Sequence, residues 1–272
     1  MIIHNKKVTI IKYIILWFMF LVVMLPFISI TLTSLTRTDL IGKQLIPEKI
    51  VFNNYITVLT RTPFMLYMWN TVYIGVLVAL GNCFFNSLAA YAFARMKFPF
   101  RDKIFLLLVA TLIIPGEVTV LPMYMFMREL SWIDSHLALI IPRIASIFWI
   151  FFLRQFYYSL PMDLESSAKI DGASWFQIYL KIILPLVKAP LFTSGLLLFF
   201  SVWDDFLWPI TVINSASKHL VQVAVTVLNT EFYTDVGARY DNVILCALPT
   251  IILFIFVQKQ YIAGVTEGSI KS

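Results

Sequence analysis

Charged side chains are scarce in this sequence. Asp, Glu, Lys and Arg together make up 13% of the 272 residues, while apolar residues make up 60%. In soluble domains charged residues average about 25% and apolar residues about 45–50%. An apolar fraction this high cannot be enclosed in one globular core, because surface area rises too steeply with chain length. The surplus must face lipid or other membrane helices, which excludes a soluble globular protein.

Motifs for catalysis, metal binding and nucleotide binding are also missing. The two cysteines, Cys83 and Cys246, lie in apolar runs without a CxxC motif or a neighbouring histidine, so they indicate neither a metal site nor a disulfide framework. His4, His136 and His219 lie far apart, and no H-E-x-x-H motif or GxxxxGK[ST] loop is present. The sequence therefore predicts that any nucleotide hydrolysis belongs to a partner, and a membrane-embedded enzyme finds no support.

Long apolar stretches with few charges mark the expected membrane spans. A spanning helix needs roughly 20 mostly apolar residues. Six stretches meet this requirement and predict an all-α, polytopic membrane protein that forms a single domain over residues 1–272: residues 13–36, 69–94, 104–126, 137–158, 190–209 and 242–261. The first stretch lacks an A-x-A cleavage site, so we expect a retained helix rather than a signal peptide.

The basic residues predict the orientation in the membrane. With the N-terminus inside, thirteen Lys and Arg residues fall in cytoplasmic segments and seven fall outside. The group between Arg95 and Lys103 is the clearest contribution to this bias. The positive-inside rule then places both termini in the cytoplasm. The net charge of +6 is explained by topology, and no basic stripe interleaved with aromatic residues suggests nucleic-acid binding.

The expected cytoplasmic segment 160–185 has an unusual pattern. Asp163 and Glu165 place acidic groups in the first turn of a helix, where the helix dipole favours them. Gly172 permits a break in the helix, and apolar residues then resume a helical pattern up to Pro185. The pattern predicts two short helices joined at Gly172 that lie along the membrane face. An ordinary amphipathic interfacial loop is the simpler interpretation of the same pattern.

The spacing in this segment resembles the EAA loop of ABC importer permeases, which reads E-A-A, three residues, Gly, nine residues, Ile-x-Leu-Pro. The residues that fall at those intervals, or match the D-G-A that is usual in the family, are Ser166, Ser167, Ala168, Asp171, Gly172, Ala173, Ile182, Leu184 and Pro185. Ser166 stands at the position of the motif's Glu, and Glu165 lies one place earlier, about 100° away around a helix. The resemblance implies a coupling helix that seats in a cleft of an ATPase subunit through Glu165, Ser166, Ser167, Ala168, Asp171 and Gly172.

The resemblance extends along most of the chain. The similarity is to the carbohydrate branch of these permeases, and it lies in residues 86–95, 114–118, 154–156 and 203–209. Within that branch the chain resembles the maltose-permease type-G subunits, and its residues 261–272 resemble the C-terminal tail of those subunits. It implies a permease subunit in the bacterial cell membrane, with a second related permease, two copies of a cytosolic ATPase and an extracytoplasmic solute-binding protein as partners. The solute would be a mono-, di- or oligosaccharide. ATP and Mg would bind to the ATPase, and this chain would bind no cofactor.

Two charges within the expected spans are candidates for function, because a charge at the membrane centre costs about 2.5–3.5 kcal/mol on insertion scales. Glu117 follows a Pro-Gly break in the third span, and Arg143 lies in the fourth. One interpretation is an ion pair between neighbouring helices. The other is that one or both face the permeation cavity.

The segment 203–209 carries a second candidate set at the end of the fifth span. Trp203, Asp204, Asp205 and Trp208 are typical of an interfacial aromatic belt with acids in water. Carboxylates and indoles are also the groups that bind sugars, through hydroxyl hydrogen bonds and contact with the apolar ring face. We take Glu117, Arg143, Trp203, Asp204 and Trp208 as the candidate substrate pathway.

Two other kinds of transporter fit parts of the sequence. An ion- or proton-coupled secondary transporter could use Glu117 and Asp204 as its titrating groups, but such folds usually show inverted repeats and paired broken helices, which are not visible here. The same ABC permease role for a solute other than a sugar is the second alternative.

Overall fold

The computed structural model describes residues 6–44, 46–231 and 236–267, and these residues form helices and connecting loops without a named strand. The chain divides into two compact units, Met1–Phe64 with Ala224–Pro249, and Met65–Val223 with Thr250–Ser272. The predicted all-α polytopic membrane fold is confirmed.

The first unit contains the most apolar helix of the chain. α1 (Lys6–Ser34) has no buried residue across its most apolar window, so its whole circumference is suited to lipid or to another membrane helix. At its end the Ser34 hydroxyl lies 2.7 Å from the Tyr55 hydroxyl of α2 (Asn53–Arg61). The short helix η1 (Thr38–Leu40) lies between α1 and α2 in the chain, and α14 (Val236–Glu267) begins in this unit and continues into the second.

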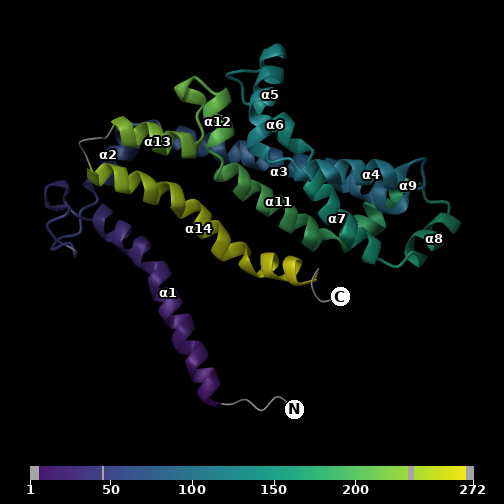
Figure 1. Cartoon of the computed structure of the whole chain (residues 1–272), viewed down its shortest axis with the longest axis horizontal. Coiled ribbons are helices and arrows are strands. Elements are labelled where there is room, and N and C mark those ends of the chain that lie inside the picture. The colour runs from purple at the N-terminus through teal and green to yellow at the C-terminus, as the bar shows by residue number, and fades with distance from the viewer. Residues whose placement is uncertain (1–5, 45, 232–235, 268–272) are drawn as a thin grey trace. The chain divides into compact units, whose positions relative to one another are not determined.

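The second unit begins with the long helix α3, in which all residues but the first belong to this unit. The elements that follow in this unit, in chain order, are α3 (Phe64–Arg95), α4 (Arg101–Ala110), η2 (Thr111–Ile113), α5 (Gly116–Glu129), α6 (Leu137–Ile144), α7 (Ile147–Ser159), α8 (Asp163–Ile170), α9 (Trp175–Ile178), η3 (Tyr179–Ile183), α10 (Leu184–Leu186), α11 (Lys188–Trp203), α12 (Leu207–Val212) and η4 (Ala216–Lys218). α13 (Val221–Glu231) begins in this unit and belongs to the first unit from Ala224 onward. α7 packs against both α4 and α11 (Figure 1).

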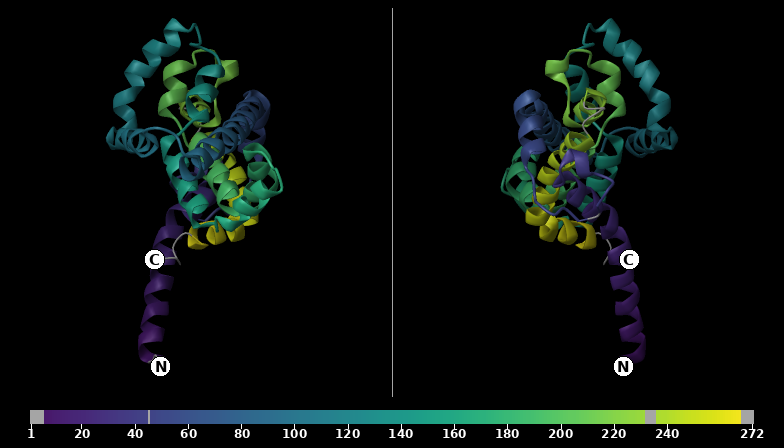
Figure 2. Two further views of the ribbon diagram at one scale, coloured as in Figure 1. Left: turned by 90° about the vertical axis from the view of Figure 1, so that its right-hand side faces the viewer. Right: turned by 90° about the vertical axis from the view of Figure 1, so that its left-hand side faces the viewer.

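Two of the expected spans are sharply bent. Four helical stretches are long and apolar enough to cross a membrane in the described residues, or up to six if each bent pair counts as one span. α4 and α5 meet at 103°, because Ile114 and Pro115 adopt extended backbone between them (Figure 2). The segment from Trp175 to Leu186 meets α11 at 79°. The six-span count remains a prediction, and the break expected at Pro115 is present.

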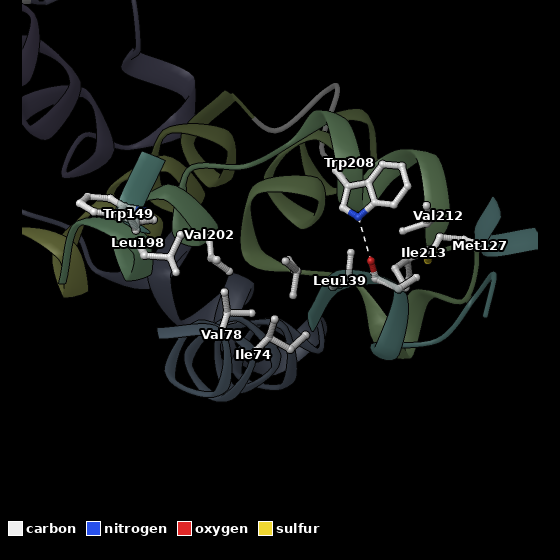
Figure 3. Packing of buried hydrophobic residues seen from close by; sticks show 12 residues of the cluster. Ile74, Val78, Met127, Leu139, Trp149, Leu198, Val202, Trp208, Val212 and Ile213 are labelled. Atoms are coloured by element: carbon white, nitrogen blue, oxygen red, sulfur yellow. Dashed lines mark hydrogen bonds between the residues drawn. The ribbon is translucent and has the colours of Figure 1, made fainter. Parts of the chain in front are cut away.

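Buried side chains of the second unit form two clusters. The first joins residues of α3, α5, α6, α7, α11 and α12, and the Trp208 indole nitrogen donates to the Ala138 carbonyl oxygen at 2.9 Å within it (Figure 3). The second lies around the ends of α3 and α7 and the segment that follows α8, with Tyr91, Tyr157 and Tyr179 among its members. The first cluster packs α5, α6 and α12 against α3 and α11, and the second packs the predicted EAA-type loop against α3 and α7.

Glycine allows α3 and α11 to approach closely. A Cβ atom placed on Gly195 of α11 would lie 2.8 Å from the Cys83 sulfur of α3, and one placed on Gly75 would lie 2.8 Å from the Phe199 ring. Real Cβ atoms do not approach other atoms this closely. The two helices are therefore in contact through positions where a larger residue does not fit.

Gly195→Ala should lower the free energy of unfolding by about 1–3 kcal/mol, because it overpacks this contact. Cys83→Ala in the same chain should restore most of the loss by removing the opposing sulfur. Thermal melting of the purified protein in detergent measures both effects. Gly116→Ala is the control, since nothing lies within 4 Å of a Cβ atom there. An equal loss in Gly195→Ala with and without Cys83→Ala would contradict the proposed contact.

Candidate functional site

The segment after α7 folds as two short helices joined at Gly172, as predicted. α8 ends at Ile170 with Asp171 as its C-cap, and Gly172 has a φ of +81°, a conformation that side-chain-bearing residues rarely adopt. Ser174 and Gln177 form a reciprocal capping box at the start of α9, with Gln177 N–H donating to Ser174 Oγ at 3.3 Å and Ser174 N–H donating to Gln177 Oε1 at 2.8 Å. These local signals define the shape of the loop.

The faces of α8 differ in exposure. Glu165 and Ala168 lie three residues apart, on the same face of the helix, and both are buried. Ser166 and Ser167 are exposed, and the side chain of Ile170 is 86% exposed. Asp171 and Gly172 are also exposed. The six predicted coupling residues therefore divide into a buried pair and an exposed set, and Glu165 does not lie on the exposed face.

Glu165 is paired with Arg95 at the last residue of α3. Arg95 Nε and Glu165 Oε1 lie 3.0 Å apart, outside hydrogen-bonding geometry, and the side chains are only 2% and 7% exposed. Arg95 Nη2 also donates to the Leu160 carbonyl oxygen at 2.6 Å. Burial raises the pKa of the Glu165 carboxyl, and the positive charge of Arg95 opposes that rise. One arginine thus holds both the start of the loop and its first helix.

A buried hydroxyl cluster holds the second part of the loop. Ser87 Oγ of α3 lies 2.5 Å from the Tyr157 hydroxyl of α7 and 2.8 Å from the Tyr179 hydroxyl of η3. Tyr179 begins a π-helical turn, a geometry that is often found at functional sites. Hydrogen bonding inside a protein is strong because the local dielectric is low. The loop is therefore attached to α3 at two points, Arg95 and Ser87.

A second site is a cavity of about 350 Å³ between α5, α6 and α12, which we call the α5–α12 cavity. Three of the five predicted pathway residues line it, namely Glu117, Arg143 and Trp208. Its complete lining is Gly116, Glu117, Thr119, Val120, Met123, Pro142, Arg143, Asp205, Leu207 and Trp208. Trp203 and Asp204 are not among the lining residues, and Trp203 is buried beside Phe199.

Arg143 pairs with Asp205 across this cavity, and not with Glu117. The interpretation of Glu117 and Arg143 as an ion pair is therefore wrong. Although the two lie at similar depths along their spans, Asp205 lies closer to the guanidinium. Asp205 also accepts a hydrogen bond from Trp208 N–H at 3.4 Å through its other oxygen. Asp205 lies two residues before α12 begins, where a carboxylate can accept from a backbone N–H of the first turn, and this position distinguishes it from Asp204.

Polar contacts hold the connection that follows α12. Asp134 accepts hydrogen bonds from Asn214 N–H at 3.0 Å and from Ser215 N–H at 2.8 Å, and it forms an ion pair with Lys218 at 3.0 Å. Bonding to Ser215 holds the pKa of the Asp134 carboxyl well below its ordinary value. The connection over residues 211–241 is long and polar, a pattern that predicts a small external cap, and it falls partly on residues 232–235, which lie outside the described residues. The contacts of Asp134 with Asn214, Ser215 and Lys218 hold the chain just after α12 beside the α5–α12 cavity.

The ion pair between Arg95 and Glu165 can be tested by removing its members one at a time. Arg95→Ala should lower the free energy of unfolding by about 3–5 kcal/mol, because it leaves a buried carboxylate without its cation. Replacing both residues by Met should recover most of this loss. Thermal melting in detergent measures both effects. Stability in the double variant that is no higher than in Arg95→Ala would argue against the pair.

The same variants predict a pH dependence. In Arg95→Ala the pKa of the Glu165 carboxyl should rise further, so the folded state retains the proton when the unfolded chain, with a pKa of about 4.3, has lost it. The stability of this variant should therefore fall as the pH rises above about 4.3. Adding Glu165→Gln should remove that dependence. The melting temperature across a pH series measures this dependence. If the variant that combines Arg95→Ala with Glu165→Gln loses stability with rising pH as steeply as Arg95→Ala alone, this account is contradicted.

Known proteins similar to this chain are transport permeases. It is 31% identical over 227 residues to an arabinooligosaccharides transport system permease protein of Halalkalibacterium halodurans, covering 83% of this chain and 81% of that protein. It is 28% identical to a lactose transport system permease protein of Rhizobium radiobacter, covering 81% of each. An sn-glycerol-3-phosphate transport system permease protein of Brucella abortus is 29% identical, covering 74% of this chain and 72% of that protein.

The fold is similar to that of a solved transporter. A chain from the crystal structure of a bacterial ABC transporter involved in the import of the acidic polysaccharide alginate matches with a TM-score of 0.84 at 23% identity, covering 94% of this chain and 96% of that chain. The family model described as the binding-protein-dependent transport system inner membrane component matches residues 86–261, which include the two-helix loop and the α5–α12 cavity. The chain belongs to the family of binding-protein-dependent transport system inner membrane components.

Proposed function

We propose that this chain is a transmembrane subunit of an ATP-driven importer for a carbohydrate and forms half of the translocation pathway. The names of two relatives support the solute class, since one is a permease for arabinooligosaccharides and the other a permease for lactose. The partners are a second related permease, two copies of a cytosolic ATPase and an extracytoplasmic solute-binding protein. ATP and Mg bind to the ATPase, and this chain catalyses no covalent chemistry.

The exposed face of α8 is the observation that carries this proposal. Ser166 and Ser167 leave room for another surface to approach closely, and Ile170 projects a large apolar side chain next to them. Buried apolar anchors surrounded by small contacts are typical of the centre of a protein interface. This face docks on the ATPase, while Glu165 contributes from inside by holding the helix on Arg95.

Closure of the ATPase then moves the permease through α8. Arg95 and Ser87 attach the loop to α3, and the same hydroxyl cluster includes Tyr157 of α7. A displacement of α8 therefore pulls on two long helices and not on a free loop. This attachment suits a subunit that must convert a movement at the cytoplasmic face into a change of the pathway.

The α5–α12 cavity is this chain's contribution to the solute pathway. Its volume lies within the range of about 300–1,000 Å³ that is usual for small-molecule sites. It combines an indole, two carboxylates and a guanidinium, which are the groups that bind sugar hydroxyls and ring faces. Both termini lie in the cytoplasm of a bacterial cell in this proposal, which puts α8 on the same side as the ATPase.

Ile170→Asp should reduce association with the ATPase by at least about tenfold, because loss of a central apolar anchor costs about 2 kcal/mol or more. The exposed position implies that folding of the permease is unchanged. Co-purification of the ATPase with tagged permease, together with solute-stimulated ATP hydrolysis in vesicles, measures the effect.

Phe100→Ser is the matched control, because Phe100 is a large apolar residue that is 69% exposed and lies in the connection between α3 and α4, outside α8. This variant should retain the ATPase. Normal co-purification and normal stimulated hydrolysis in Ile170→Asp would contradict docking through this face of α8.

A further inference from the structure

We infer that the carbohydrate that passes through the α5–α12 cavity is uncharged, and that Glu117 excludes anionic solutes from it. The inference rests on the proposed function and adds the charge class of the solute. It follows from the way in which the three charged residues that line the cavity, Glu117, Arg143 and Asp205, are paired.

The positive charge in the cavity wall is already neutralised. Arg143 forms an ion pair with Asp205, and the side chains are only 26% and 15% exposed. Asp205 is held in place by a second hydrogen bond, which its other carboxylate oxygen accepts from the backbone N–H of Trp208. An anionic solute that binds Arg143 must displace Asp205 and leave its carboxylate half-buried without a cation. The loss of a partner from such a pair costs more than a new anion contact regains.

Glu117 supplies the remaining charge. It is exposed in the first turn of α5, and its carboxylate has no hydrogen bond or ion pair within the part of the chain that the structure describes. The wall therefore carries a net charge of −1 from these three residues. A like charge close to this carboxylate is repelled, and the repulsion is strong where protein and lipid exclude water. Uronates and sugar phosphates meet this repulsion, whereas neutral sugars do not.

Neutral sugars match the same groups. A carboxylate without a partner accepts two or more hydroxyl hydrogen bonds, and sugar hydroxyls supply such donors in pairs. The Thr119 hydroxyl donates to the Gly116 carbonyl oxygen and leaves its own lone pairs available to a solute hydroxyl. Trp208 contributes an apolar surface whose orientation is fixed by its bond to Ala138. The cavity thus offers acceptors and an apolar wall, and its only cation is occupied.

The family by itself does not decide the charge of the solute. The similar proteins include permeases for arabinooligosaccharides and lactose, which are neutral, and one for sn-glycerol 3-phosphate, which is an anion. The pairing of Arg143 and the free carboxylate of Glu117 separate the two classes for this chain.

The charge of the cavity can be measured without knowing the solute. Thr119→Cys, in a chain with Cys83→Ala and Cys246→Ala, places one thiol on the cavity wall of the assembled transporter. Neutral, cationic and anionic methanethiosulfonate reagents of similar size then label it. We expect the cationic reagent to react faster than the anionic one, and Glu117→Gln to reduce that ratio about tenfold, since it removes the net charge.

Glu129→Gln is the matched control, because Glu129 is exposed at the opposite end of α5 and does not line the cavity. It should leave the ratio unchanged. A ratio that does not respond to Glu117→Gln, although the neutral reagent labels the thiol, overturns the charge inference alone. Failure of the neutral reagent to label the thiol overturns the proposed pathway as well.

The solute class is tested in vesicles that contain the assembled transporter with its binding protein. Lactose and arabinotriose serve as neutral probes, and galacturonate and sn-glycerol 3-phosphate as anionic probes. Stimulation of ATP hydrolysis by a neutral probe alone supports the inference. Stimulation by either anionic probe overturns it and leaves the proposed importer function intact.

Discussion

The buried contact between Arg95 and Glu165 is the interaction on which the two-helix loop depends. A pair of charges that is almost fully buried is costly to desolvate, so it persists only where each charge has the other as a partner. Here the cation belongs to the last turn of a long helix and the anion to a short one. The result is that α8, which is too short to be stable by itself, takes its position from α3.

The second anchor explains why the loop continues directly into a spanning segment. Tyr179 bonds to Ser87 from within a π-helical turn, and the backbone then turns through 79° into α11. α11 in turn contacts α3 through Gly195 and Gly75. The same long helix therefore receives the loop at two points and α11 along its length. Movement at α8 and the packing of the membrane helices are linked through α3.

Local patterns were sufficient for some of these features. Gly172, the acidic first turn of α8 and the break at Pro115 all act through the backbone of their immediate neighbours, and each is present in the structure. The faces of α8 were not predictable in this way, because the burial of Glu165 depends on Arg95, which is 70 positions earlier in the chain. The pairing of Arg143 with Asp205 depends on helix rotation, which depth in the membrane does not specify.

The bend at Pro115 makes α5 a lever with a fixed point near the cavity. Its 14 residues extend about 21 Å at 1.5 Å per residue. A tilt of about 10° around Pro115 would move the far end by about 4 Å but move Glu117, within the first turn, by about 0.5 Å. A tilt of α5 would therefore displace its far end and leave the carboxylate of Glu117 almost in place, so the charge that this helix presents to the cavity does not depend on its tilt.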